Sequence, residues 1–572
     1  MQGTIDTSSL GYILSHHLGV NWLIVLLVWL ETAIAAGACL AALGRHLADV
    51  QRRGLRASLK RPGLGMVGLG VLAVALACRM ALPEATFLHE NFQGYLLFND
   101  AAALTPVRTQ YGLGYQAVYG LAMAVFGARF EVLFGLSVLC GALSAVLLAV
   151  VARRLLGWSL TAALMTGLMA ALHPALVRFS ASEILYVPGL FFVLLGVALL
   201  TDWRANRRRF SLAGGLTALL VAAQMRPDVG ILAAVVLVVL LAALLLSARR
   251  SLLHRERLRE LVSGPCLAMG AAALLAAFLP LHNLLWRALY EPSGSFSLLG
   301  GGLATYGRLL SNRGLLPFEG GHAVFNLAFT PLLFMAAQLA GLAILAVRRP
   351  VQAAALVLII GLFTALWLPV QTSPFMVGRV QYGLMLMWTL PGGFCLAWCA
   401  GQVARLPLPG AKPVAVILLA GAMATGFFAR DRLLAARFSP QEETAFIGAS
   451  MDALPQDTLL VIMPGDEVVN SFFPAAHQSL AARGVTLLTM QDRWRDTVAA
   501  HPGPAYFYLG LGCYCFKNMQ ELNSQGPLRP ACLEALSLAG AALRETRIPS
   551  IPFDFLALPK GSLTLGFYSL KD

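Results

Sequence analysis

The chain has 572 residues, of which 58% are hydrophobic and only 12% are charged, and its mean hydropathy is +0.73. A soluble enzyme cannot hide so much apolar surface, so the composition excludes an ordinary soluble fold and predicts a multi-span membrane protein. The net charge of +14 does not indicate nucleic-acid binding, because the basic residues stand in short loops between apolar runs, where they set orientation in the bilayer.

Apolar runs recur from residue 20 to about residue 430, and each has roughly the ~20 residues needed to cross a bilayer. The first run follows a segment without a basic region and is too long for a cleavable signal, so we expect it to be a transmembrane span. The runs predict about twelve transmembrane helices. These helices are expected at residues 20–43, 64–82, 131–152, 158–177, 183–201, 210–225, 228–247, 261–281, 326–347, 352–370, 381–401 and 411–429.

Lys and Arg collect in every second loop, which predicts the orientation of the chain. The basic loops carry Arg45, Arg52, Arg53, Arg56, Lys60 and Arg61; Arg153 and Arg154; Arg204 and Arg207 to Arg209; Arg249, Arg250, Arg255, Arg257 and Arg259; Arg348 and Arg349; and Arg405 and Lys412. These loops should face the cytoplasm. Both termini, the loop 83–130 and the tail then face the periplasmic side of a bacterial inner membrane.

Near residue 431 the long apolar runs end, and shorter apolar runs separated by polar segments follow. The stretches "DTLLVIMPGDEVVN", "GVTLLTMQ" and "PAYFYLGLGC" read as short buried strands, with helical stretches at 440–453 and 530–543 between them. "MPGDE" lacks the glycine spacing of nucleotide-binding loops, so we expect no nucleotide there. The predicted fold class is an α-helical polytopic membrane protein with a C-terminal extracytoplasmic α/β domain. Its expected parts are 1–63 (extra helix and basic loop), 64–430 (transmembrane domain) and 431–572 (α/β domain).

Three cysteines of the tail predict a disulfide, because the extracytoplasmic compartment permits oxidation. Cys513 and Cys515 alternate along a strand with Cα atoms ~6.5–7 Å apart, which is unfavourable for a bridge between them. Cys532 is therefore the expected partner of Cys513 or of Cys515, and the third thiol stays free. A zinc site is the alternative, but no four-ligand spacing is visible.

A polar cluster, "FLHENFQGYLLFND" at 87–100, directly follows the second apolar run. It contains His89, Glu90 and Asp100. The glycine- and aromatic-rich segment 111–127 comes next and should lie along the membrane surface. The cluster thus stands where a span ends, a suitable place for water-phase chemistry on a lipid headgroup.

The segments around this cluster follow an order that can be compared with known membrane proteins. An apolar span, an acidic residue, an aromatic and glycine-rich stretch ending in "FG" and a span ending "ARRLLG" precede "ALHPALVRFSASEILYVPGLFFVLLGVALL" and "AAQMRPDVGILA". This order resembles the GT-C integral-membrane glycosyltransferases of the lipid-A aminoarabinose transferase and protein O-mannosyltransferase type. The resemblance covers residues 64–250 well and 251–430 in general plan.

The resemblance implies a polyprenyl-phosphate-linked sugar as donor and an acidic general base in the first extracytoplasmic loop. Glu90 of "HEN" matches the base, and His89 replaces the acid that the family often has before it. Displacement of phosphate from an anomeric carbon also needs positive charge near the leaving group, which arginine forks supply. The candidates for donor phosphate binding are Arg226, Arg379, Arg308 and Arg313, and those for substrate binding are Asp100, Glu183 and Tyr382; Arg108 and Arg178 lie on the same face.

These residues predict a membrane glycosyltransferase that acts with inversion, as the resemblance implies, on a lipid, glycan or protein acceptor. No cofactor is expected, and a divalent metal is left open. The alternative to a catalytic role is that Glu90 is an ordinary solvent-exposed carboxylate of the loop. Two alternative functions are a transporter or flippase of polyprenyl-linked glycans and a non-catalytic membrane scaffold. The absence of a clear repeat, and charges that cluster at helix ends, disfavour the transporter.

Overall fold

The computed structural model resolves the chain into two compact units, one helical and one built on a β-sheet. The structure describes residues 18–53, 63–81, 98, 101–102, 104, 113–226, 229–235, 330–367, 382–405, 407, 410–428, 439–463, 484–490, 493–514, 528–549 and 562–571.

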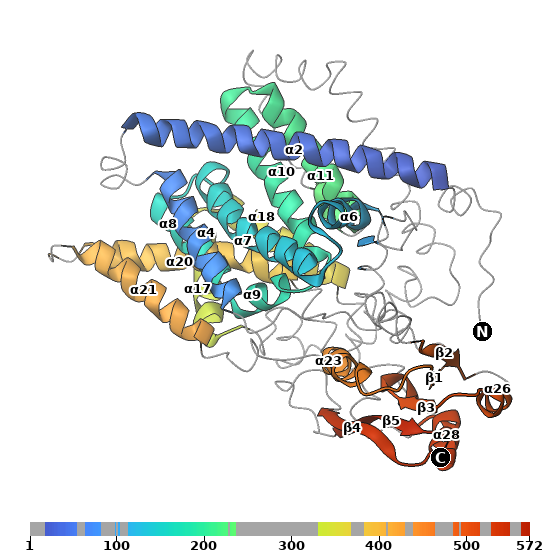
Figure 1. The fold of residues 1–572 in the computed structure, drawn as a ribbon. Coiled ribbons are helices and arrows are strands. Elements are labelled where there is room, and N and C mark those ends of the chain that lie inside the picture. The colour runs from blue at the N-terminus through green and yellow to red at the C-terminus, as the bar shows by residue number, and fades with distance from the viewer. Residues whose placement is uncertain are drawn as a thin grey trace. The chain divides into compact units, whose positions relative to one another are not determined.

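The helical unit carries the apolar runs (Figure 1). Its helices are α2 (Leu18–Arg53), α4 (Leu64–Met80), α6 (Gly114–Phe126), α7 (Phe130–Arg154), α8 (Leu160–Leu172), α9 (Pro174–Ser180), α10 (Tyr186–Asn206), α11 (Arg209–Met225), α17 (Leu332–Arg348), α18 (Pro350–Trp367), α20 (Tyr382–Val403) and α21 (Ala411–Phe428). Within the described residues five helices are long and apolar enough to cross a membrane, or up to six if the bent pair α8 and α9 forms one span. These helices make the chain a multi-pass membrane protein.

The count of about twelve spans stays a prediction, since the helix expected at 261–281 lies outside the described residues and that at 228–247 is described only over 229–235. The expected bounds of α4, α7, α11 and α21 are correct to within two residues. Charged residues, glycine and proline delimit those runs in the sequence, and the same residues end the helices.

The single helix expected at 158–177 is wrong. The structure has two helices there, α8 and α9, bent by 59° at their junction. His173 is extended (φ −73°, ψ 118°) and Pro174 begins α9. Proline lacks a backbone N–H and disfavours helical geometry in the residue before it, so the helix breaks at this pair. His173 itself is fully buried against Phe334, as expected for a packed histidine.

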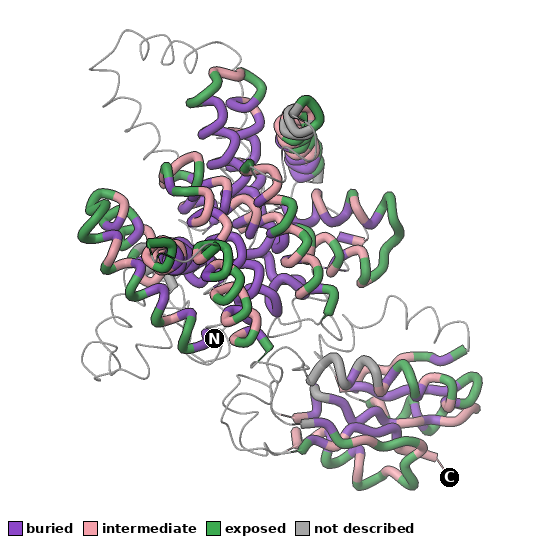
Figure 2. Tube along the Cα trace, turned by 90° about the vertical axis from the view of Figure 1, so that its left-hand side faces the viewer, coloured by how far each residue is buried: buried purple, intermediate pink, exposed green. Residues whose placement is uncertain are grey.

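Buried residues make up most of α8, α10, α11 and α20, and Figure 2 shows such buried segments in the middle of the helical unit. α10 is buried along nearly its whole length, from Tyr186 to Trp203. The large exposed apolar side chains, by contrast, stand on outer helices, for example Leu30 on α2, Val351 on α18 and Leu418 on α21. In a bilayer such side chains face lipid, so their exposure agrees with membrane insertion.

The N-terminal helix α2 packs closely on α11 and α6. A Cβ added to Gly214 of α11 would lie 2.3 Å from the Cβ of Ala38, so only glycine permits this approach. The indole Nε1 of Trp29 donates a hydrogen bond of 2.8 Å to the carbonyl of Ala117 in α6. The span that the sequence marks as an addition is therefore an integrated part of the bundle.

The second unit is a five-stranded sheet in the order β2-β1-β3-β5-β4. Its strands are β1 (Leu459–Ile462), β2 (Thr486–Thr489), β3 (Ala505–Leu509), β4 (Ala542–Pro549) and β5 (Ser562–Ser569), and its helices are α23 (Ser439–Met451), α26 (Trp494–Ala500), α28 (Pro530–Leu538) and the short 3-10 helix η4 (Leu511–Cys513). β1 runs parallel to β2 and β3, whereas β5 is antiparallel to both β3 and β4.

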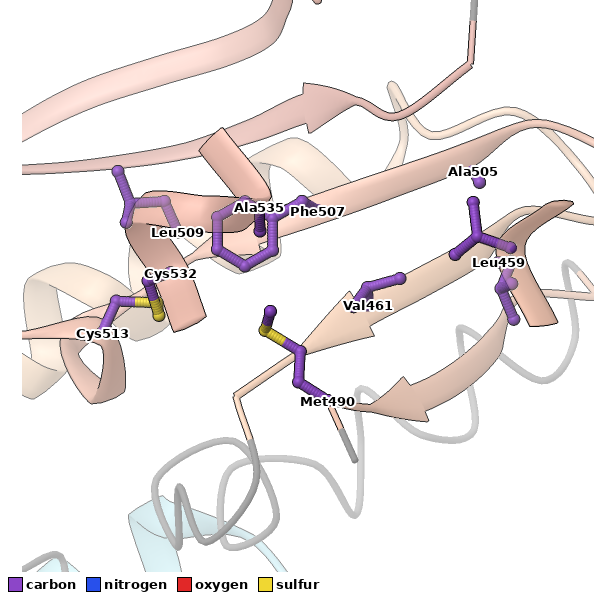
Figure 3. Packing of buried hydrophobic residues seen from close by; sticks show 10 residues of the cluster. Leu459, Val461, Met490, Ala505, Phe507, Leu509, Cys513, Cys532 and Ala535 are labelled. Carbon is purple, nitrogen blue, oxygen red and sulfur yellow. A yellow bond between two sulfur atoms is a disulfide. The ribbon is translucent and has the colours of Figure 1, made fainter. Parts of the chain in front are cut away.

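One face of this sheet covers a compact apolar core (Figure 3). Val461 of β1 and Phe507 of β3 are fully buried there, together with Met490 and the two half-cystines Cys513 and Cys532. On α23, the ring of Phe446 lies 5.7 Å from that of Phe567 in β5. The alternating side chains of the strands thus supply both apolar layers.

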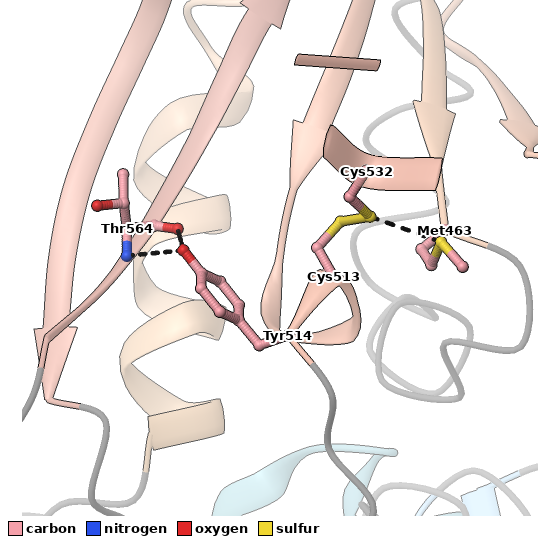
Figure 4. The surroundings of a disulfide bond; sticks show 5 residues. All are labelled: Met463, Cys513, Tyr514, Cys532 and Thr564. Carbon is pink, nitrogen blue, oxygen red and sulfur yellow. Dashed lines mark hydrogen bonds between the residues drawn. A yellow bond between two sulfur atoms is a disulfide. The ribbon is translucent and has the colours of Figure 1, made fainter. Parts of the chain in front are cut away.

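The predicted disulfide is confirmed, and it joins Cys513 to Cys532 with a Cα–Cα distance of 5.7 Å (Figure 4). It fastens η4, which follows β3, to α28. The sulfur of Met463 lies 3.6 Å from the Cys532 sulfur. Next to the bridge, the Tyr514 hydroxyl donates to the carbonyl of Thr564 and accepts from its N–H, at 2.5 and 2.9 Å. The third cysteine, Cys515, lies outside the described residues.

Two of the sequence expectations for the tail need correction. The helix expected at 530–543 ends at Leu538, and residues 542–549 form β4 instead. β5 was not expected at all. The three strands expected from the buried runs are present as β1, β2 and β3, but β3 ends at Leu509, so Cys513 lies in η4 and not on a strand as expected.

Candidate functional site

The structure describes three of the nine residues that the sequence proposes for the site. These are Arg226, Glu183 and Tyr382. Glu90, His89, Asp100, Arg308, Arg313 and Arg379 lie outside the described residues. The site is therefore built from the helix ends that surround the three described positions.

The two ends of the helical bundle differ in charge. At one end Arg45 of α2, Arg154 of α7 and Arg208 before α11 all lie within ion-pair distance of Asp202 in α10. At this end too, the loop after α7 meets Arg349, whose guanidinium donates to the carbonyl of Leu156 at 3.2 Å. Four of the basic loops that the sequence assigns to one side thus come together at one end.

The other ends of α7, α10 and α11 carry a different set of buried polar side chains. Arg79, Arg178, Glu183, Ser180, Ser182, Gln224, Tyr115, Tyr119 and Tyr382 are all buried there. They come from the C-terminal ends of α4, α9 and α11, the N-terminal ends of α6 and α20, and the segment between α9 and α10. Burial of charged groups in a bundle is costly unless the protein supplies polar partners, so such a group marks a functional candidate.

Arg79 ties three helices together. Its Nε donates to the hydroxyl of Ser180 at 2.7 Å, and its Nη2 donates to the carbonyls of Gly141 and Leu176 at 3.3 and 3.5 Å. Nη1 bonds to the carbonyl of Ala75 in its own helix at 3.0 Å. All four acceptors are neutral oxygens, so among the described residues this guanidinium is solvated without a carboxylate hydrogen-bond partner.

Glu183 lies in the short connection between α9 and α10, and it is almost wholly buried. Tyr115 and Tyr119 of α6 stack on each other with ring centroids 4.3 Å apart, and both lie within electrostatic range of the Glu183 carboxyl group. The Tyr119 hydroxyl also shares a 2.9 Å hydrogen bond with that of Ser137 in α7. Glu183 and the two tyrosines thus belong to the same buried end of the bundle.

Arg226 follows the last residue of α11 and is partly exposed. Its guanidinium carbon lies 4.2 Å from the ring centroid of Tyr186, the first residue of α10. Arginine on a tyrosine face is a favourable cation–π pair that holds the planar group in a fixed orientation. Because Tyr186 comes shortly after Glu183, the fold brings Arg226 and Glu183 to the same end of the bundle.

Tyr382 is the first residue of α20 and is fully buried. Its hydroxyl lies within electrostatic range of Arg79 and of Cys140 in α7. The three described site candidates therefore belong to one end of the helical unit, with Tyr382 linked to the others through Arg79 and Ser180.

The sequence did not single out six members of this group, which are Arg79, Tyr115, Tyr119, Ser180, Ser182 and Gln224. One signal was present for Arg79, because it is an arginine within the apolar run "VLAVALACRM", and ionisable residues inside spans are commonly functional. The two tyrosines carry no such signal, since aromatic residues are common in any interfacial segment.

Arg226 is a partly exposed arginine at this end of the bundle. Arginine donates in a planar fork that matches phosphate oxygens, and buried carboxyl and phenol groups can orient hydroxyls of a sugar. Among the described residues, no group of three or more His, Cys, Asp or Glu side chains gathers to hold a metal ion.

Comparison with known proteins finds similar structures but no match by sequence. No protein-family model matches the chain, and no curated protein does. The chain is similar to the oligosaccharyltransferase AglB of Archaeoglobus fulgidus, solved with an inhibitory peptide and a dolichol-phosphate, at 13% identity and a TM-score of 0.45 over 73% of this chain. It spans 64% of that protein.

The chain is also similar to ArnT of Cupriavidus metallidurans, solved bound to undecaprenyl phosphate, at 15% identity and a TM-score of 0.47. That similarity covers 88% of this chain and 98% of ArnT. Both similar proteins are GT-C glycosyltransferases, and ArnT is of the lipid-A aminoarabinose transferase type that the order of segments in this sequence resembles.

Proposed function

We propose that this protein is a GT-C-type glycosyltransferase that moves a sugar from a polyprenyl-phosphate donor to an extracytoplasmic lipid, glycan or protein acceptor. One observation carries the proposal. Glu90 stands between Arg79 and Tyr115 in the sequence, and both of these side chains belong to the buried polar group around Glu183. Residues 81 and 113, which flank the segment that holds the proposed base, therefore both belong to that end of the helical unit.

In the proposed reaction an acceptor hydroxyl attacks the anomeric carbon of the donor sugar. A bond forms between the hydroxyl oxygen and the anomeric carbon, and the bond from that carbon to the phosphate oxygen breaks. Glu90 takes the hydroxyl proton, with His89 orienting the carboxylate or sharing the proton. Polyprenyl phosphate leaves with the electron pair, and a single displacement of this kind inverts the configuration.

Positive charge would stabilise the departing phosphate. We assign this role to Arg226, Arg379, Arg308 and Arg313, and we assign contacts with the sugar or acceptor to Asp100, Glu183 and Tyr382. The fixed orientation of Arg226 on Tyr186 supports its part in this assignment. A guanidinium held in place loses less entropy when it binds phosphate oxygens.

The proposal includes the placement of the protein. About twelve spans within residues 20–430 and a tail domain after residue 431 would sit in a bacterial inner membrane, with the basic end of the bundle in the cytoplasm. The buried polar end would then face the periplasm, where polyprenyl-linked sugars meet their acceptors.

The proposal is tested with purified protein in liposomes that contain polyprenyl-phosphate sugars and an extract of envelope acceptors. Wild-type protein should release free polyprenyl phosphate and add sugar mass to one acceptor class. Glu90→Gln should bind donor yet transfer at least ~100-fold more slowly, the scale expected for the loss of a general base. Glu84→Gln, in the same segment, is the matched control and should keep wild-type turnover. Near-normal turnover of Glu90→Gln removes Glu90 from the mechanism.

A flippase of polyprenyl-linked glycans is the second candidate, because two observations favour it. Glu31 is a buried acid within the candidate span of α2, away from the helix ends where we expected charges to cluster. α8 and α9 also form a broken helix, a feature of transporters. Movement of a fluorescent polyprenyl-linked sugar across the liposome membrane, without covalent transfer, would favour this function over the transferase.

A further inference from the structure

The basic end of the helical unit contains a compact charged group that the proposed transfer does not use. Asp202, near the end of α10, is buried and accepts hydrogen bonds from the hydroxyl of Ser211 at 2.7 Å and from Nδ2 of Asn206 at 2.8 Å. Three arginines surround the same carboxylate. We call Asp202, Arg45, Arg154 and Arg208 the Asp202 cluster.

Arg45 and Arg208 lie near Asp202 but are not saturated by it. Arg154 Nη1 donates a hydrogen bond to Oδ1 at 3.3 Å, whereas Arg208 Nη1 lies 3.6 Å from Oδ1 and Arg45 Nη2 lies 3.6 Å from Oδ2. The two longer distances exceed the ~2.7–2.9 Å of a charge-assisted hydrogen bond. A carboxylate offers about four lone-pair sites, and Ser211, Asn206 and Arg154 already use three of them. The charges of Arg45 and Arg208 are therefore in excess at this carboxylate.

The cluster lies at the level where apolar helices end. Arg154 is the last residue of α7, and Arg208 directly precedes α11. α2 brings Arg45 to the same place, because Gly37 lets the ring of Phe210 approach to 3.3 Å from a Cβ position. The Arg45 and Arg208 side chains remain 38% and 40% exposed. Helix ends of this kind stand at the headgroup region of a bilayer.

We propose that the Asp202 cluster binds the phosphate of an anionic phospholipid headgroup. Asp202 gathers guanidinium groups from three separate helices, and the excess charge is left for a phosphodiester. Basic pockets between transmembrane helices recognise lipid headgroups by this chemistry. The neighbouring side chains favour a lipid over a soluble anion, because Leu43 beside Arg45 and Phe210 beside Arg208 are half-exposed and apolar. They suit contact with the acyl chains of the same lipid.

Full-length protein in detergent, supplied with phosphatidylglycerol or with phosphatidylcholine, provides the test. Native mass spectrometry counts the lipids that each variant retains. Arg45→Gln with Arg208→Gln should bind phosphatidylglycerol about 10- to 30-fold more weakly, from the contribution of each cation at a membrane surface. Arg405→Gln with Lys412→Gln removes the same charge from other exposed residues of the predicted basic loops, and this matched control should bind like wild type. Phosphatidylcholine should be retained equally by all.

Two further arms control for loss of folding and for binding of a soluble anion. Adding Asp202→Asn to the arginine pair removes the negative charge that would otherwise be balanced by Arg154 alone, and thermal unfolding confirms that each variant is folded before the comparison. Asp202→Asn alone should keep phosphatidylglycerol, because the amide oxygen still accepts hydrogen bonds from the arginines and no longer competes as an anion. Equal lipid retention by the cluster variants and the matched control overturns the proposal. Displacement of phosphatidylglycerol by excess inorganic phosphate also overturns it, because it would show a site for a free anion.

Discussion

A charge inside a bundle must be solvated by the protein, and Arg79 is solvated by oxygen atoms from three helices. Ser180 and Leu176 belong to α9, and Gly141 belongs to α7. The guanidinium thereby fixes the end of α9, from which the chain turns toward Glu183. Arg79 is for this reason a positioning residue for the proposed site.

Arg79→Leu should lower transfer by at least ~10-fold, because losing hydrogen bonds of a charged group costs about 1.5–3 kcal/mol and releases the turn before Glu183. Arg79→Lys should recover part of the rate, since an ammonium keeps the charge but has three donors instead of five. Turnover and thermal unfolding are measured on the same preparations. Wild-type turnover in Arg79→Leu would contradict the positioning role.

At the level of residues, sequence reasoning predicted the polar positions at span ends but not the partners that bury them. Glu183 and Tyr382 were recognisable as polar residues where apolar runs begin, and both lie at the predicted end of the bundle. The role of Arg79 depends on carbonyls of α7 and α9, which become neighbours only in the folded bundle. No spacing within the sequence encodes that contact. The parts of the site outside the described residues, Glu90 among them, stay predictions.

At the level of elements, α17 and α20 approach each other closely at Gly341. A Cβ at Gly341 would lie 1.8 Å from the carbonyl oxygen of Pro391, which is backbone and cannot move aside cheaply. Pro391 stands inside α20. The contact therefore requires glycine at this position.

Gly341→Ala should lower the thermal stability of the purified protein by at least ~1–3 kcal/mol, the cost of overpacking. Gly361→Ala in α18 is the control, because nothing lies within 4 Å of its Cβ position and alanine is the better helix former. The two variants are compared by thermal unfolding in one detergent. Equal melting temperatures would show that α17 and α20 do not pack as described.

The disulfide makes a second prediction for the elements. Cys513→Ser and Cys532→Ser should each destabilise the sheet unit by ~3 kcal/mol, the amount expected for opening a loop between residues 19 apart in sequence. Cys515→Ser should leave it unchanged. Limited proteolysis of the full chain reads the stability, and mass spectrometry of non-reduced peptides reads the linkage. Three alkylated thiols, or a link between Cys513 and Cys515, would refute the pairing.

Sequence patterns predicted the secondary structure correctly where one pattern, such as a short run of buried aliphatic residues, stands alone. They failed where two patterns overlap in the same segment. β1 and β3 are short runs of buried aliphatic and aromatic residues, and both were expected. The helix expected at 530–543 included the first two residues of β4, because "AL" of "ALRETRIP" continues an alanine-rich helical pattern. Residues 542–549 form a strand because they pair with β5, which lies later in the chain. Likewise, the apolar run 158–177 hides the break at Pro174 because its hydropathy is continuous.

At the scale of the whole molecule, the two ends of the helical unit carry different groups of polar side chains. The basic loops meet at the Asp202 end, and the buried polar group around Glu183 occupies the other end of the same helices. The positive charge of the loops predicted which loops lie at the same end of the helical unit. The contacts of Arg45, Arg154, Arg208 and Arg349 agree with that grouping.

A reporter fused through a flexible linker after Asp572 should be active on the extracytoplasmic side, because the basic loops and the even span count both require it. A fusion after Gly157, next to Arg153 and Arg154, is the control and should report from the cytoplasm. Paired alkaline phosphatase and fluorescent protein fusions distinguish the two compartments. A cytoplasmic reading after Asp572 would place Glu90 on the wrong side for the proposed chemistry.

The order of the strands in the sheet determines when the sheet can be completed during synthesis of the chain. β5 is made after the other four strands of the described sheet, yet it is an inner strand that pairs with β3 on one side and with β4 on the other. Until residues 562–569 have been made, β3 keeps an open edge and β4 has no partner in the described sheet. The sheet therefore cannot be completed before β5 is available. Chains truncated before residue 562 should be cleared by proteases, although every residue of the proposed site is intact.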